Sequence, residues 1–209
     1  MKTTFGRASP HKPTGSPTAF HAPLFDDLVA GLDATRRHVI LDLGAGSTAM
    51  LALLSQSRCR AEIADLAHFD GIDQLNDAES DRARTAAAES LLPDRSTDEA
   101  IDLVLCWDLP NYLTLDALSG LMSTIARRAC PGALAHALVF YADREMNEHP
   151  GRFVPTADGA LIDRSAPSAA IAAPRYSPED LGKNMGGFMI DRVRLLGNGM
   201  QEFLFRLGT

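Results

Sequence analysis

The stretch Val39-Ile40-Leu41-Asp42-Leu43-Gly44-Ala45-Gly46 is a short apolar strand that ends in an acidic residue and a glycine turn. A second short strand, Ala61-Glu62-Ile63-Ala64-Asp65, also ends in a carboxylate. Asp65 follows Gly44 by about 20 positions, the length of turn, helix and return strand in a nucleotide-binding unit. Glycine lets the backbone approach a ligand, and a strand-end carboxylate can accept hydrogen bonds from a ribose. The pattern predicts a site for an adenosine-containing cofactor.

Around this unit, strands and helices alternate along the chain. Apolar runs predict further strands at 101–107, 133–141, 188–196 and 200–207. Helical spacing or capping residues predict helices at 23–32, 47–54, 77–92 and 114–129, and a short one from Ser177. The last two strands flank Gly197-Asn198-Gly199, a connection typical of an antiparallel hairpin. This order predicts a doubly wound, mostly parallel α/β sheet with an antiparallel edge.

The bulk composition limits the classes of function. A chain of 209 residues with 45% hydrophobic residues is large enough for one domain with its own core. The formal charge of −7 opposes binding to nucleic acid or to an acidic membrane. The three cysteines, Cys59, Cys106 and Cys130, lack metal-ligand spacing, so we expect reduced thiols, no metal and a cytoplasmic location. No apolar run is long enough to span a membrane, and the N-terminus lacks the apolar core of a secretory signal.

The chain divides into three parts by composition. Residues 1–22 are rich in small and basic residues and are expected to form a flexible arm, either a plain tail or a lid anchored by Phe5 or Phe20. Residues 23–209 are expected to form a single domain. Within it, residues 142–175 carry four prolines and little regularity, and we expect this insertion to lie on the substrate side.

Four motifs, in order, resemble those of the class I S-adenosylmethionine-dependent methyltransferases. They are the glycine turn at 41–46, the acid Asp65, the segment 102–108 and the turn Pro131-Gly132-Ala133. The resemblance extends from Pro23 to Thr209 and implies a seven-stranded Rossmann-like sheet closed by the C-terminal hairpin. Two features depart from the family pattern: a third glycine is missing after Gly46, and the third-strand region reads as a helix.

The resemblance also implies S-adenosylmethionine as cofactor and a set of contacts to it. Asp65 would bind the ribose hydroxyls, and Asp42 would order the glycine turn and face the amino-acid end indirectly. Glu89-Ser90 is the nearest match to the family's adenine-binding acid, a match that fails if the stretch is helical. The complete set of expected cofactor contacts is Asp42, Gly44, Ala45, Gly46, Asp65, Leu66, Glu89, Ser90, Trp107 and Asp108.

Catalytic residues are less well marked. Asp108 and Tyr112 follow the strand at 101–107, where the resemblance places the reaction centre, and Tyr141 and His149 are possible general bases. Each of them also reads as an ordinary wall or surface residue. Methyl transfer from a sulfonium chiefly requires alignment of the reactants and exclusion of water, so the absence of a catalytic triad is expected.

The sequence therefore favours a methyltransferase that acts on a small-molecule acceptor by in-line transfer, with a homodimer left possible. Two alternatives stay open. One is a non-catalytic scaffold or regulatory protein with the same fold, and the other is an NAD(P)-dependent oxidoreductase, which the closing hairpin opposes.

Overall fold

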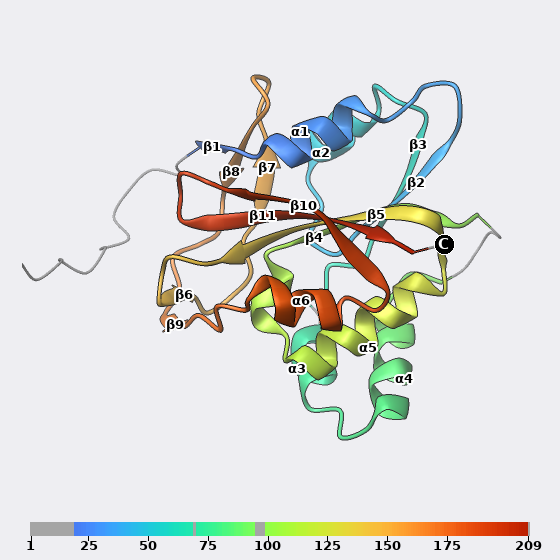
Figure 1. Cartoon of the computed structure of the whole chain (residues 1–209). Helices are drawn as coiled ribbons and strands as arrows, with labels where there is room; N and C mark the ends of the chain where they lie inside the picture. The colour runs from blue at the N-terminus through green and yellow to red at the C-terminus, as the bar shows by residue number, and fades with distance from the viewer. Residues whose placement is uncertain (1–18, 69, 95–98, 209) are drawn as a thin grey trace, which may run out of the picture.

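The computed structural model describes residues 19–68, 70–94 and 99–208 (Figure 1). Its helices are α1 Pro23–Ala30, α2 Thr48–Leu54, α3 Gly71–Asn76, α4 Asp81–Leu91, α5 Leu115–Ala126, α6 Pro178–Asn184 and the short 3-10 helix η1 Leu109–Tyr112. Its strands are β1 Ala19–His21, β2 His38–Asp42, β3 Cys59–Ile63, β4 Ile101–Trp107, β5 Ala129–Phe140, β6 Glu145–Asn147, β7 Phe153–Pro155, β8 Ala160–Asp163, β9 Ala170–Ala172, β10 Phe188–Leu195 and β11 Met200–Leu207.

The central sheet has the strand order β10-β11-β5-β4-β2-β3. The pairs β3–β2, β2–β4 and β4–β5 are parallel, whereas β11 pairs antiparallel with both β5 and β10. Every residue of β2 is buried, as a central strand covered on both faces requires. The carboxyl ends of β2, β3, β4 and β5 therefore meet at one edge of the sheet, where ligands of such sheets bind.

The expected seven-stranded sheet has six strands within the described residues, so the predicted count is wrong there. Between β3 and β4, where the seventh strand was expected, the described chain forms α3 and α4 instead. The α4 sequence is rich in alanine, which favours helix, and the side chain of Ser80 caps it by accepting from the amide of Ala83. Residues 95–98, which follow α4, lie outside the described part.

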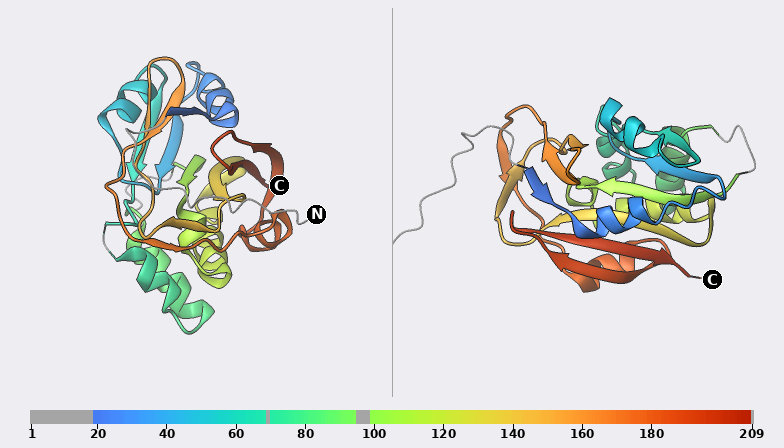
Figure 2. Two further views of the ribbon diagram at one scale, coloured as in Figure 1. Left: turned by 90° about the vertical axis from the view of Figure 1, so that its left-hand side faces the viewer. Right: turned by 90° about the horizontal axis from the view of Figure 1, so that it is seen from above.

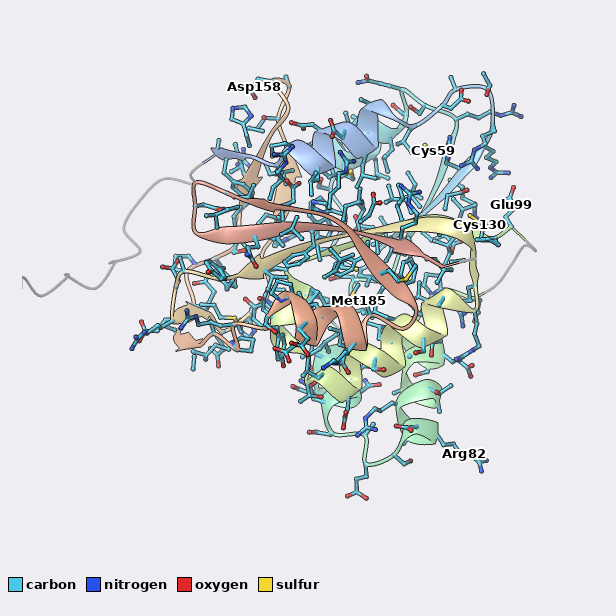
Figure 3. All side chains as sticks on the ribbon, in the orientation of Figure 1. Cys59, Arg82, Glu99, Cys130, Asp158 and Met185 are labelled. Atoms are coloured by element: carbon cyan, nitrogen blue, oxygen red, sulfur yellow. The ribbon has the colours of Figure 1, made fainter. Side chains whose placement is uncertain are left out.

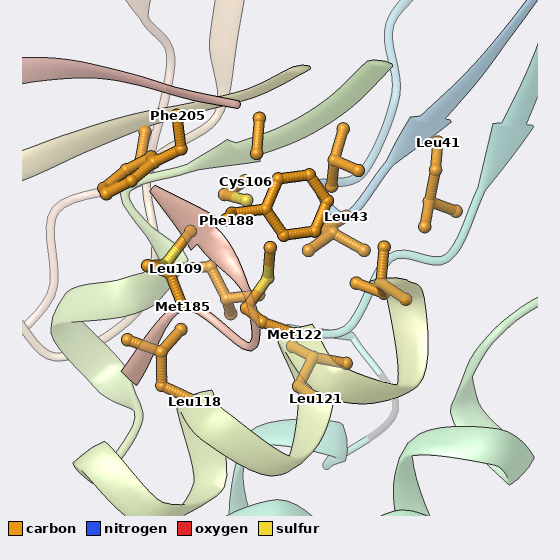
Figure 4. Close-up of a cluster of buried hydrophobic side chains, with 14 of the residues drawn as sticks. Leu41, Leu43, Cys106, Leu109, Leu118, Leu121, Met122, Met185, Phe188 and Phe205 are labelled. Carbon is orange, nitrogen blue, oxygen red and sulfur yellow. The ribbon is translucent and has the colours of Figure 1, made fainter. Parts of the chain in front are cut away.

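Helices cover both faces of the sheet, with α1 and α2 on one side and α3 to α6 on the other (Figure 1). Leu118, Leu121 and Met122 of α5 belong to one buried cluster with Leu43, which follows β2, and Phe188 of β10 (Figure 4). A second cluster joins α1 and α2 to the opposite face of β2, β4 and β11. The helical spacing of the apolar residues in 23–32 and 114–129 predicted these two buried faces.

A carboxylate from β11 caps the N-terminus of α1. Ala22 at the N-cap position has no polar side chain, and Glu202 accepts instead from the amides of Leu24 at 3.0 Å and Phe25 at 2.8 Å. Oε1 of Glu202 also lies 2.9 Å from Nε2 of His136 on β5, and both side chains are fully buried. The start of α1 is thus tied to the sheet through one buried carboxylate.

The insertion is more regular than the sequence suggested. Strands β7 and β8 form an antiparallel hairpin that β1 extends to three strands, while β6 and β9 form a separate pair. The hairpin stands beside α1 and α2, over the carboxyl edge of the sheet (Figure 2). Residues 19–21, which composition assigned to the flexible arm, are therefore part of a sheet. Phe20 packs edge-on against Phe153 with ring centroids 6.0 Å apart. The rest of the predicted arm, residues 1–18, lies outside the described part.

All three cysteines are free thiols. Burial raises the pKa of Cys106 to about 12, and burial also raises the pKa of the partly buried Cys59 and Cys130 (Figure 3). Among the described residues no group of three or more His, Cys, Asp or Glu is arranged to hold a metal ion. In the same part of the chain, no helix combines the length and apolarity needed to cross a bilayer.

Candidate functional site

The glycine turn lies against the only tryptophan of the chain. Trp107 ends β4 with a positive φ of 51° and donates from Nε1 to Oδ1 of Asp42 at 2.7 Å. The same oxygen accepts from the amide of Gly44 at 2.9 Å. A Cβ on Gly44 would stand 2.8 Å from Cδ1 of Trp107, closer than van der Waals contact allows. Asp42 therefore orders the turn, as the sequence predicted, and Gly44 is the residue that fits under the indole.

Gly46 and Asp65 complete the turn on its other side. Gly46 has a φ of +60°, and a Cβ there would meet Cδ1 of Ile63 at 2.6 Å. Backbone bonds from Ala64 to Asp42 and from Leu66 to Leu43 extend the pairing past β3 and hold Asp65 beside the turn. Asp65 has a φ of 44°, a left-handed conformation that aspartate tolerates. Burial and the proximity of Asp65 both raise the pKa of Asp42.

A cavity of about 280 Å³ opens at this turn. The glycine turn and Trp107 form one part of its lining, and residues of the insertion form another. The lining residues are Asp42, Gly44, Ala45, Gly46, Ser47, Met50, Trp107, Gly151, Arg152, Phe153, Val154 and Arg164. Phe153 is buried and stacks on Trp107 with an interplanar angle of 19° and centroids 5.7 Å apart. The structure thus brings the glycine turn and the insertion together around one cavity.

Asp108 and Tyr112 hold the insertion in place. The buried carboxylate of Asp108 accepts from the amide of Gly151 at 3.0 and 2.9 Å, while Tyr112 donates from its hydroxyl to the carbonyls of Asn147 and His149. Burial raises the pKa of Asp108 from 3.8 to about 7, and burial also raises the pKa of Tyr112. Neither residue lines the cavity. Both residues therefore attach the insertion to the region around η1 through hydrogen bonds.

The raised pKa of Asp108 makes the stability of the wild type depend on pH. Between its ordinary value of 3.8 and about 7 the folded protein binds more protons than the unfolded chain, so this group lowers stability as pH rises through that range. Asp108→Asn keeps an acceptor for Gly151 and removes the charge. We expect urea unfolding to show a smaller decline of stability with pH in the variant, the difference reaching up to about 1.4 kcal/mol per pH unit. If the stability of the two proteins changed with pH in parallel, ionisation of Asp108 would carry no free-energy cost in the folded protein.

Other predicted residues lie away from the cavity. Glu89 and Ser90 are exposed on α4, where Glu89 pairs with Arg127 at 3.3 Å and Ser90 bonds to the carbonyl of Ala87. The match to an adenine-binding acid fails because the stretch is helical. Leu66 is fully buried in the core, and its side chain is absent from the cavity wall.

The two remaining candidates for general bases are surface residues. Tyr141 is 48% exposed, and the side chain of His149 is also exposed. Neither residue lines the cavity. Neither predicted general base therefore lies at the cavity beside the glycine turn.

Part of the cavity wall was not predicted. The insertion as a whole was expected on the substrate side, and none of its cavity-lining residues Arg152, Phe153, Val154 and Arg164 was expected beside the glycine turn. These four residues lie more than 100 positions after the glycine turn. Local patterns carry no signal for such a contact; only the pairing of β1, β7 and β8 beside α2 creates it.

Comparison with solved structures identifies the fold. A methyltransferase from Methanosarcina mazei, described as S-adenosylmethionine-dependent, superposes with a TM-score of 0.51 at 15% identity, over 90% of this chain and 98% of that one. The Burkholderia thailandensis 1,6-didemethyltoxoflavin-N1-methyltransferase, solved with S-adenosylhomocysteine, gives 0.46 at 19% identity over 88% and 77%. The pyocyanin biosynthetic protein PhzM gives 0.47 at 14% over 88% and 54%, so this chain spans about half its length. No family model and no curated protein matches the sequence.

Proposed function

We propose that this chain, which has the fold of the class I S-adenosylmethionine-dependent methyltransferases, transfers a methyl group from S-adenosylmethionine to a small molecule. One observation carries the proposal: the cavity opens on the glycine turn at the carboxyl edge of the sheet. Backbone bonds on either side of Asp65 hold this residue next to the turn, although Asp65 itself does not line the cavity. The turn is a cradle, because a Cβ on Gly44 or Gly46 would collide with Trp107 or Ile63. Its residues fit the amino-acid end of this cofactor, and Asp65 fits the ribose.

The bound cofactor would supply an activated methyl group, so the chain needs to align the reactants rather than activate a leaving group. Asp42 holds the turn and the indole of Trp107 in one geometry. Phe153 covers Trp107 and excludes water from that side of the cavity. We propose in-line transfer to an acceptor that enters beside the insertion, with a small molecule favoured because the net charge of −7 disfavours nucleic acid.

Asp65→Ala tests the proposal directly. The single tryptophan lines the cavity, so quenching or a shift of its fluorescence reports ligand binding without a label. We expect S-adenosylhomocysteine to change the fluorescence of the wild type. Loss of an acceptor for the buried ribose hydroxyls costs ~1–3 kcal/mol, so the variant should bind roughly 5- to 150-fold more weakly.

Titration of the wild type with NADH and NADPH is the control for ligand class. A wild type that binds only a nicotinamide cofactor would contradict the proposal. If a folded Asp65→Ala variant bound S-adenosylhomocysteine as tightly as the wild type, Asp65 would have no part in the site. The proposal would then depend on the glycine turn alone.

A further inference from the structure

Two arginines lie side by side at the cavity. Arg152 immediately precedes β7 and Arg164 immediately follows β8. The register pairs Phe153 with Asp163, and the amide of Arg164 donates to the carbonyl of Arg152 at 2.9 Å, which continues the ladder by one step. The two arginines are therefore direct cross-strand neighbours, and both line the cavity.

Like charges at directly opposite positions disfavour strand pairing. Both arginines are exposed, so water screens part of their repulsion, and an anion bound in the cavity would compensate the rest. Within the described residues neither guanidinium forms an ion pair with a carboxylate, whereas Arg36, Arg84 and Arg192 do. The nearest acid along the hairpin, Asp163, is engaged with the backbone amides of Arg152 and Ser165. The hairpin itself leaves the positive charge at the cavity uncompensated.

The part of the same cavity formed by the glycine turn carries the opposite charge. Asp42 lines it, and Oδ1 of this carboxylate is used by Trp107 and Gly44. The cavity is thus lined by one carboxylate from the glycine turn and two guanidinium groups from the insertion. A zwitterionic amino acid is complementary to such a cavity: its ammonium matches the carboxylate, and its carboxylate matches the arginines, whose planar donors suit bidentate binding.

We propose that Arg152 and Arg164 bind the α-carboxylate at the amino-acid end of the cofactor. This inference rests on the proposed function, which puts S-adenosylmethionine in the cavity. The insertion then belongs to the cofactor site as well as to the acceptor side. It selects ligands that retain the carboxylate over those that have lost it.

The test compares two ligands on two proteins. S-adenosylhomocysteine and its decarboxylated form, which differs only by the carboxylate, are titrated calorimetrically into the wild type and into the double variant Arg152→Met/Arg164→Met. Methionine keeps an unbranched side chain and removes the charge. We expect the wild type to prefer S-adenosylhomocysteine by about tenfold or more and the double variant to lose that preference. As salt increases, the affinity for S-adenosylhomocysteine should also fall more steeply for the wild type than for the double variant.

Arg82→Met is the matched control. Arg82 is exposed on α4, on the other side of the sheet from the turn of the β7–β8 hairpin at Asp158 (Figure 3). We expect this variant to keep the ligand preference of the wild type. The thermal midpoint of the ligand-free double variant should equal or exceed that of the wild type, because the repulsion between the two arginines is gone.

The outcomes separate the two proposals. A folded double variant that keeps the full preference for S-adenosylhomocysteine overturns the inference and leaves the proposed function intact. A double variant that weakens both ligands equally also overturns it, since the arginines would then act only on the shape of the site. A wild type that binds neither ligand overturns the proposed function, and the inference falls with it.

Discussion

Glu202→Leu should destabilise the protein by about 3–5 kcal/mol, because it breaks a fully buried pair and removes a helix cap at once. Without the carboxylate, the amides of Leu24 and Phe25 and Nε2 of His136 are left without their acceptor in an interior closed to water. Urea unfolding followed by Trp107 fluorescence measures the loss, since Phe25 and His136 both pack against that indole.

Two further variants serve as controls for this prediction. Glu202→Gln keeps one side-chain oxygen and is expected to lose less stability than Glu202→Leu. Glu179→Ala breaks an exposed pair with Lys183, in which the two side chains are 76% and 70% exposed, and is expected to change stability little. If Glu202→Leu unfolded at the urea midpoint of the wild type, the buried network would contribute nothing to the attachment of α1.

Gly44→Val should abolish binding of S-adenosylhomocysteine, a loss of more than about 100-fold, equivalent to ~2.7 kcal/mol. Even a Cβ at this position would stand 2.8 Å from Trp107 and 3.3 Å from Oδ1 of Asp42. The branched side chain has to displace the indole, which breaks the Trp107–Asp42 bond and fills the turn against which the cofactor is proposed to lie. Calorimetric titration measures the loss.

Gly197→Val is the matched control, because a Cβ at Gly197 has no heavy atom within 4 Å and its φ is not positive. This variant should bind like the wild type. Far-ultraviolet circular dichroism close to that of the wild type would show that Gly44→Val retains its secondary structure. Normal binding by a folded Gly44→Val variant would mean that the turn has no part in the cofactor site.

Much of the scaffold could be predicted because its signals are local. Apolar runs marked β2 and β4, and Pro23 with a helical apolar face marked α1. The turn after β2 was also predicted, because glycines after a strand favour a tight turn. The incorrect prediction of a seventh strand came from the family resemblance. The alanine-rich sequence of α4 had already indicated a helix in that region.

The sequence by itself determined the alternation of strands and helices and the carboxyl-edge position of the turn at Gly44, since periodicity and turn chemistry act over a few residues. Only the tertiary structure decided which distant side chains complete the cavity. It showed that Asp108 and Tyr112 form hydrogen bonds to the insertion, and it brought Arg152 and Arg164 into the same cavity lining as Asp42. Burial and charge at these positions depend on strand pairings between segments far apart in the chain, and no local pattern encodes them.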